Sequence, residues 1–331
     1  MKETYILTTS PHIHNAESIP RVMYSVVIAL IPAVLVSIYY FGVSALIIYL
    51  ISIASCLVFE AAAQKVMGRP ITIGDGSIMI TAILLAMNIP STSPWWLVVV
   101  GALVAVVLGK QIYGGLGHNP FNPVLVARIL LLISFPVQMT AWVEPVPLFS
   151  GVDSVSMATP LGDMKTTLML KGLIDTSHFS YMDTFIGFVG GSLGETSVLA
   201  LLVGGIFLLA RRVITWHVPA TYIGTVFALT GVFWLIDPTK YANPVFHILS
   251  GGLMLGALFM ATDMVTSPVY PRGMLIFGIG CGIITVLIRL FGGYPEGVAF
   301  SILLMNAATP LIDRYTTPKK FGSIVLDEAA K

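Results

Sequence analysis

A threonine in the longest polar break of this chain stands in a sequence suited to covalent modification. The segment Asp153–Leu161 reads DSVSMATPL and separates two long apolar regions. The hydroxyl of Thr159 can form a phosphoester. Pro160 cannot continue a regular hydrogen-bond ladder, so it favours an exposed bend beside that hydroxyl. Asp153 and Ser156 would be read by a modifying enzyme, Ala158 keeps the approach to Thr159 open, and the alternative is an ordinary polar loop.

A second segment, Gly114–Pro123, reads GGLGHNPFNP and could approach a ligand with its backbone. Its glycines permit left-handed conformations. Its two Asn-Pro steps fix turns and open the following helix. Amide groups exposed at a helix start can hold an anionic or carbonyl-rich ligand. The segment therefore predicts a tight interhelical turn, a ligand site formed with Gly117, Asn119 and Asn122, or both.

Several ionisable residues fall within or beside apolar segments. A charge at membrane depth is costly, so each is a candidate for an ion pathway or a cofactor contact. Glu195 also has the spacing of a capping box with Ser192, which is the structural alternative. We select Glu195 and Asp263 as candidates for an ion pathway. The same group includes Glu60, Asp75, Arg128, Arg289 and Glu296.

Composition places the chain in a membrane. Of its 331 residues, 56% are hydrophobic and only 10% are charged, against roughly 25% charged in soluble domains. The first apolar segment lacks a cleavage pattern, so we interpret it as a retained helix. A net charge of +1 gives no argument for nucleic acid. The sequence contains no ATP-binding or dinucleotide-binding motif and no histidine spacing typical of a metal site.

Apolar runs predict an all-α integral membrane protein of about ten transmembrane helices. Residues 1–139 would form a first membrane half, 140–184 an extracytoplasmic loop, 185–313 a second half and 314–331 a cytoplasmic tail. Most Lys and Arg residues, including Lys110 and Arg128, then fall on the cytoplasmic side with both termini. The predicted spans are Val22–Phe41, Val43–Ala63, Ser77–Ile89, Trp95–Tyr113, Val124–Met139, Phe185–Ala210, Val218–Ile236, His247–Ala261, Met274–Leu290 and Val298–Ile312.

The two membrane halves resemble each other. The stretch from Gly76 to Pro94 is similar to that from Gly251 to Pro268, and each passes from a glycine-rich helix into a polar break. A glycine pair follows one helix later in both copies. An odd number of helices per half inverts the second copy, and inverted repeats place a site at their interface. We therefore predict two inverted five-helix repeats.

The motifs together resemble the RnfD subunit of the Rnf complexes and, more distantly, the NqrB subunit of the sodium-pumping NADH:quinone oxidoreductase. The resemblance runs along nearly the whole chain. The segments that carry it are Ser10–His12, Gly114–Pro123, Asp153–Thr159, Gly191–Ser197, Ala261–Asp263, Gly292–Phe300, Leu304–Asn306 and Pro310–Tyr315.

This resemblance implies a urea-transporter-like fold and a subunit of a prokaryotic plasma-membrane complex. Such complexes pass electrons between ferredoxin and NAD and couple the transfer to Na⁺ or H⁺ translocation. It implies FMN joined by its phosphate to Thr159, placed there by a flavin transferase, and a second, noncovalent flavin such as riboflavin in the helical core. The implied partners are Rnf subunits A, B, C, E and G, and membrane lipid.

The rival interpretation is a small-solute channel of urea-transporter type without flavin, and a scaffold is a third. Ten helices in two inverted halves suit a channel equally well. Only the Thr159 segment discriminates between them, because a channel has no need of it.

Overall fold

The structure, a computed structural model, describes residues 18–146, 155–174 and 179–318. Helices are the main regular structure of these residues, and the one β-bridge among them is the isolated pair Val143 and Ser156. The predicted helical class is therefore confirmed for the described residues. The elements are α1 (Ile19–Val66), η1 (Ile73–Asp75), α2 (Ser77–Met87), α3 (Trp95–Leu103), η2 (Val104–Gln111), α4 (Pro123–Ser134), α5 (Pro136–Met139), α6 (Pro160–Lys171), α7 (Tyr181–Ile186), α8 (Val198–Ala210), α9 (His217–Ile236), α10 (Pro244–Leu249), α11 (Leu253–Leu255), η3 (Gly256–Met260), α12 (Pro271–Phe291) and α13 (Val298–Thr316).

Among the described helices, α1, α9 and α12 are long and apolar enough to cross a bilayer. Helix α1 is two segments joined at Gly42, whose φ of 63° and ψ of −145° are not helical. Glycine adopts such a conformation without steric penalty, which explains the break. The sequence predicted two spans meeting at this residue. The total of ten spans and their arrangement as inverted repeats stay predictions.

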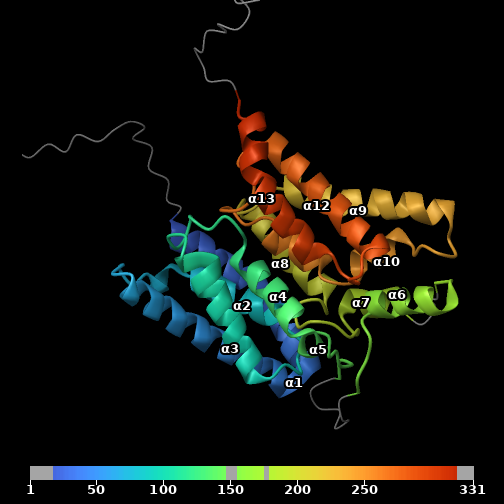
Figure 1. Cartoon of the computed structure of the whole chain (residues 1–331), viewed down its shortest axis with the longest axis horizontal. Coiled ribbons are helices and arrows are strands. Elements are labelled where there is room, and N and C mark those ends of the chain that lie inside the picture. The colour runs from blue at the N-terminus through green and yellow to red at the C-terminus, as the bar shows by residue number, and fades with distance from the viewer. Residues whose placement is uncertain (1–17, 147–154, 175–178, 319–331) are drawn as a thin grey trace, which may run out of the picture.

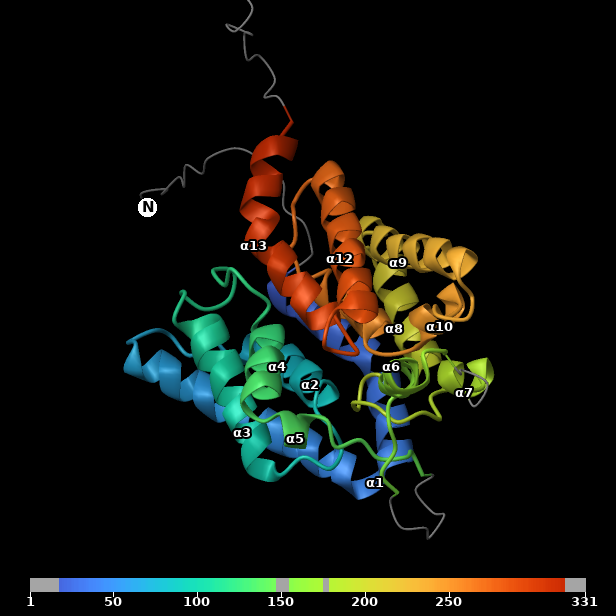
Figure 2. The same cartoon turned by 45° about the vertical axis from the view of Figure 1, so that its right-hand side comes forward.

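Helices α2–α5 and helices α9–α13 form two groups on different sides of the molecule (Figure 1). Helix α1 packs against α2 and α3 of the first group and against α8, which leads into the second. Within the second group, α12 packs against both α9 and α13. The turned view shows α6 and α7 beside α10 of the second group (Figure 2).

Small residues let the helices approach closely. A Cβ atom on Gly204 of α8 would collide with the carbonyl oxygen of Ala29 in α1. On α12, a Cβ on Gly278 would collide with the Thr221 hydroxyl of α9. Close backbone approach is how membrane helices gain packing energy when burial from water contributes little.

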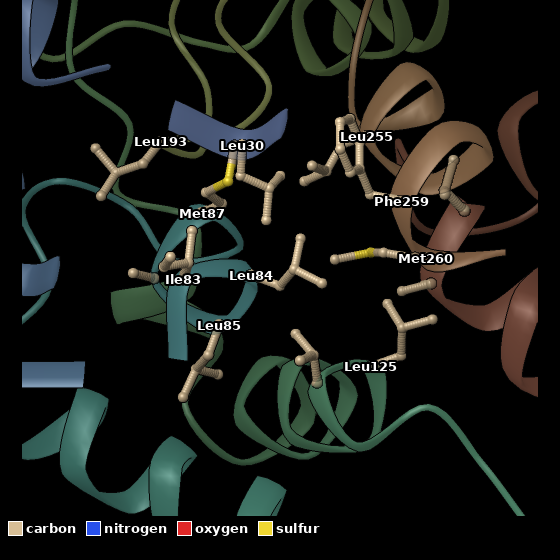
Figure 3. Close-up of a cluster of buried hydrophobic side chains, with 14 of the residues drawn as sticks. Leu30, Ile83, Leu84, Leu85, Met87, Leu125, Leu193, Leu255, Phe259 and Met260 are labelled. Carbon is tan, nitrogen blue, oxygen red and sulfur yellow. The ribbon is translucent and has the colours of Figure 1, made fainter. Parts of the chain in front are cut away.

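The two helix groups meet in a cluster of buried apolar side chains (Figure 3). Leu30, Met87, Leu193 and Leu255 converge there from α1, α2, the segment before α8 and α11. The segment before α8 is fixed by backbone hydrogen bonds, since the Gly194 N–H donates to the Met87 carbonyl over 2.8 Å. Because Glu195 follows directly, this contact places its carboxylate between the two groups.

Candidate functional site

Thr159 is the N-cap of α6, a helix of 12 residues. Its Oγ1 accepts a hydrogen bond from the Gly162 N–H at 3.1 Å. A Cβ on Gly162 would lie only 2.9 Å from this oxygen, so glycine leaves the hydroxyl uncrowded. The positive end of a helix dipole and its free N–H groups favour a phosphate at this position. The local geometry therefore suits a phosphoester on Thr159.

The residues before Thr159 form an extended segment on the surface. The Met157 N–H donates to the Trp142 carbonyl at 3.1 Å, and Ser156 forms its bridge with Val143. The side chains of Ser156 and Ala158 are exposed, and Thr159 is half-buried. Part of the predicted recognition sequence is thus open to another protein. Asp153 lies outside the described residues.

Thr159 opens on a pocket with about 760 Å³ of empty space, open solvent included, which we call the α6 pocket. Part of its lining is aromatic and consists of Trp142, Tyr294 and Phe300, which we call the aromatic wall; the last two rings stack with centroids 5.2 Å apart. Another part is charged and contains Arg128, Glu195 and Glu296.

Arg128 of α4 joins these two carboxylates. Its Nη2 lies 2.8 Å from Glu195 Oε1 and 2.8 Å from Glu296 Oε2, and its Nη1 donates to Asn88 Oδ1. The side chains are largely hidden, with exposed fractions of 13% for Arg128, 6% for Glu195 and 16% for Glu296. A buried charge needs such partners, because removing it from water is costly.

A second arginine completes the charged group. Arg289 of α12 lies 4.0 Å from Glu296 and is fully buried. Its guanidinium donates to the carbonyl oxygens of His247 and Ser250 at 2.5 and 3.2 Å. Glu296 Oε1 also accepts from the Gly252 N–H. We call the set Arg128, Glu195, Arg289 and Glu296 the charge cluster.

Lys165 ties α6 to the loop that carries Glu296. Its ammonium donates to the carbonyl oxygens of Gly292 and Tyr294, the latter at 2.9 Å. Burial lowers the pKa of this ammonium from its ordinary value. Helix α6 also packs Leu161 and Met164 against Phe246. Thr159 and Glu296 are therefore held in a fixed relation by a helix and a loop that share hydrogen bonds.

Replacing Lys165 by methionine should loosen this loop. Hydrogen bonds from a charged donor contribute about 1.5–3 kcal/mol, so amide exchange over residues 292–297 should accelerate by about tenfold or more. Hydrogen-exchange mass spectrometry on the full chain in detergent measures this. Lys171→Met is the matched control, since Lys171 is exposed at the other end of α6. Equal protection in both variants would contradict a role for Lys165.

A second pocket, of about 820 Å³, lies elsewhere and includes Asn119, Asn122 and Asp263 in its lining. Asn122 caps α4, accepting from the Val124 N–H at 3.1 Å, and donates to the Met260 carbonyl at 3.3 Å. Asp263 accepts from Thr266 Oγ1 at 3.1 Å. Gly117 adopts φ +90° in the turn and is not among the lining residues. Glu195 and Asp263, which the sequence analysis selected together as candidates for an ion pathway, therefore line different pockets.

A buried ion pair stands at the edge of this second pocket. Lys110 Nζ lies 2.9 Å from Glu60 Oε1 and also donates to Ser77 Oγ at 2.8 Å. Gln64 and Gln111 donate to the same carboxylate at 3.1 and 2.9 Å. Lys110 and Glu60 are almost fully buried, with exposed fractions of 3% and 1%. This arrangement satisfies both charges inside the protein.

One expectation from the sequence about this site was wrong. The capping box of Ser192 and Glu195 does not form, because α8 begins at Val198 and Ser197 is its N-cap. Lys110 and Arg128, which we counted among the charges on the cytoplasmic side, are buried in ion pairs. Side chains held in this way do not report which face of a membrane a loop occupies, so the orientation stays a prediction.

Sequence comparison identifies the family of the chain. A family model described as NQR2, RnfD, RnfE matches residues 6–322. The chain belongs to this family. The NQR2, RnfD, RnfE family assignment agrees with the resemblance seen in the motifs, and three of those motifs, Asp153–Thr159, Gly191–Ser197 and Gly292–Phe300, contribute residues to the lining of the α6 pocket.

Relatives within the family match over nearly their full length. The D subunit of the proton-translocating ferredoxin:NAD⁺ oxidoreductase complex of Clostridium ljungdahlii is 44% identical, with 97% of each chain covered. The D subunit of the Na⁺-translocating ferredoxin:NAD⁺ oxidoreductase complex of Acetobacterium woodii is also 44% identical, with 98% of each covered. The D subunit of the ion-translocating oxidoreductase complex of Stutzerimonas stutzeri is 45% identical, with 92% of each covered. Relatives named for different ions are equally similar, so identity does not select the ion.

Proposed function

We propose that this chain is the flavin-carrying RnfD subunit of a membrane complex that passes electrons between ferredoxin and NAD⁺ and couples the transfer to Na⁺ or H⁺ translocation. Family membership and the names of the relatives support the complex. The apolar helices α1, α9 and α12 support a position in the membrane. We place the chain in the plasma membrane of a prokaryote, with both termini cytoplasmic and residues 140–184 outside.

The observation that carries the flavin proposal is the position of Thr159. Its side-chain oxygen is the N-cap of α6 and also lines the α6 pocket. A phosphate esterified there would meet the positive end of a helix. The aromatic wall of Trp142, Tyr294 and Phe300 offers flat apolar surfaces to a planar ring. The residues present therefore fit FMN on both its phosphate and its ring.

A flavin bound in this pocket supplies exchange of one or two electrons. The residues of this chain supply the surroundings. Thr159 anchors the phosphate, and the aromatic wall keeps water from one side. Arg128, Glu195 and Glu296 of the charge cluster also line the pocket, and their charges interact strongly where little water screens them. Lys165 keeps the loop of Glu296 in place relative to α6.

We further propose that the second pocket holds a noncovalent flavin, such as riboflavin. Its lining offers amide groups from Asn119 and Asn122 and the ammonium of Lys110 among apolar side chains. Such a mixture of an apolar wall and a few convergent polar groups is typical of cofactor sites. Flavin extracted from a Thr159→Ala variant by acid and identified by mass spectrometry would test this, and its absence would oppose it.

The partners that we propose are Rnf subunits A, B, C, E and G, together with a flavin transferase that modifies Thr159. The exposed segment from Val155 to Ala158 supports access by such an enzyme. We also propose that Glu195 and Asp263 belong to an ion pathway between two inverted five-helix halves. Coupled transport that is unchanged in a reconstituted complex with Glu195→Gln and Asp263→Asn would remove both from it.

Replacing Thr159 by alanine tests the proposed function. With a flavin transferase present, the wild-type polypeptide should fluoresce under ultraviolet light after denaturing electrophoresis, because the ester survives unfolding. Thr159→Ala should lose that band. Thr166→Ala is the matched control, since Thr166 is an exposed threonine on the same helix.

A wild-type band without flavin fluorescence, from cells that contain the flavin transferase, would contradict the proposal. In that case the rival function, a small-solute channel without flavin, would explain the fold better. A solute flux assay on the same preparation in vesicles would then show transport that is independent of any electron donor.

A further inference from the structure

We propose that Glu195 and Glu296 together form the site that takes up a proton when the flavin on Thr159 is reduced. This inference rests on the proposed function, because it requires a flavin in the α6 pocket. It adds a chemical role for two carboxylates that neither the motifs nor the relatives' names assign. Both carboxylates line the α6 pocket, and Glu296 is the more exposed of the two.

The two carboxylates share one nitrogen atom. Arg128 Nη2 lies 2.8 Å from an oxygen of each, so these oxygens are brought close to one another. Two carboxylates that share a site resist being ionised together, and one of them binds a proton more readily than usual. The pair is thus a natural place for one additional proton.

The charges around the pair are balanced without that proton. Arg128 approaches from α4 and Arg289 from α12, and each brings one positive charge against the two carboxylates. His247 of α10 faces Arg289 through its carbonyl oxygen, and Lys165 of α6 holds the Glu296 loop through backbone carbonyls. Within the charge cluster, no positive charge is left over to balance a further negative charge in the α6 pocket.

A flavin held on Thr159 would supply two-electron chemistry in this pocket. Uptake of two electrons from the ferredoxin branch with one proton from water would add one negative charge there. One carboxylate of the pair would then take a second proton from water and keep the net charge of the site unchanged. Transfer of both electrons to the next carrier would release both protons to water. Glu296 is the more exposed member and lines the pocket, so it is the group through which the proton would pass.

The pH dependence of the flavin midpoint potential tests this proposal. When one proton is taken up with two electrons, the midpoint potential falls by about 30 mV per pH unit. The proposal has two protons taken up in the wild type, so the midpoint potential of its flavin should fall by about 60 mV per pH unit around neutral pH. Glu296→Gln and Glu195→Gln should each reduce the slope toward about 30 mV per pH unit. Glutamine keeps the size of the side chain and an oxygen that can accept from Gly252 or Arg128.

The measurement uses spectroelectrochemistry of the full chain, loaded by a flavin transferase, in detergent. Subtracting the Thr159→Ala spectrum isolates the covalent flavin. Glu144→Gln is the matched control, because it removes a carboxylate near the Ser156 bridge that does not line the pocket, and its slope should equal that of wild type.

Each outcome has a distinct meaning. A reduced slope in the two carboxylate variants, with a normal slope in Glu144→Gln, supports the shared proton site. An unchanged slope in both carboxylate variants that still carry fluorescent flavin overturns it and leaves the proposed function standing. A reduced slope in all three variants also overturns the assignment to this pair. Absence of bound flavin from the wild-type chain would refute the proposed function itself.

Discussion

Replacing Arg128 by alanine is expected to lower the free energy of unfolding by about 3–5 kcal/mol. The change removes the only guanidinium that contacts Glu195 directly among the described residues and leaves two buried carboxylates facing one another. Arg289, 4.0 Å from Glu296, compensates only part of that charge. Breaking a buried pair by removing one partner is costly because the other charge stays in a poorly solvated place. Chemical unfolding in mixed micelles, followed by tryptophan fluorescence, measures the effect.

The matched variant for this experiment is Arg128→Lys. Lysine keeps the positive charge but cannot reach Asn88 and two carboxylates with the planar fork of arginine. We therefore expect a loss smaller than that of the alanine variant. The double variant Arg128→Met, Glu195→Gln should recover much of the stability lost in Arg128→Ala, because it removes one buried pair of charges and leaves Glu296 beside Arg289. Equal stability of wild type and Arg128→Ala would show that the cluster is not held as the structure describes.

Replacing Lys110 by methionine is expected to have a similar cost, about 3–5 kcal/mol. Glu60 is 1% exposed and would lose the ammonium that neutralises it, although Gln64 and Gln111 would still donate to its carboxylate. Methionine fills much of the space of the lysine stem, so the loss reports the charge and not a cavity. Midpoints of chemical unfolding for the single variants provide the measurement.

A double-mutant cycle makes this second prediction specific. Glu60→Gln combined with Lys110→Met should be more stable than Lys110→Met alone, because the double variant contains no unpaired charge. The coupling between the two sites should be in the range of about 0.5–3 kcal/mol found for contacting residues. Additive effects of the two changes would contradict a direct ion pair.

The sequence could predict those parts of the fold that depend on neighbouring residues. Apolar runs predicted the long helices α1, α9 and α12, and Gly42 marked the break within α1 because only glycine adopts its backbone angles without cost. The predicted span Phe185–Ala210 was wrong, because α7 ends at Ile186 and α8 begins only at Val198. Thr159 followed by proline predicted a bend and proved to be a helix N-cap. These features arise within a few positions of chain, so local chemistry determines them.

The contacts of the charge cluster could not be predicted in the same way. The partners of Arg128 are Glu195 and Glu296, which follow it in the chain by 67 and 168 positions. No local sequence pattern predicts contacts over such separations. Glu195 was correctly selected as an unusual ionisable residue, but its alternative role as a capping residue was wrong because the helix begins only at Val198. The sequence did not predict a role for Lys165, since its hydrogen-bond partners are backbone carbonyls of a loop that is distant in the chain. Tertiary packing decides these pairings.

The two pockets have a similar arrangement of charge: in each, a buried cation is held by carboxylate and amide groups and belongs to the pocket lining. Lys110 with Glu60 marks the second pocket, and Arg128 with Glu195 and Glu296 marks the α6 pocket. Such pairs are weak evidence for stability in themselves, because an apolar replacement of the whole group often folds as well. Their position at pockets fits our proposal that both pockets bind flavin.

The central claim is that Thr159 carries a flavin through its phosphate. The most direct measurement is mass spectrometry of the peptide that contains Thr159, cut from the mature protein purified from native membranes. The account predicts a peptide heavier by one FMN less one water, with fragment ions that place the addition on Thr159. An unmodified Thr159 peptide at full occupancy would contradict the account and favour a membrane protein with no covalent redox group.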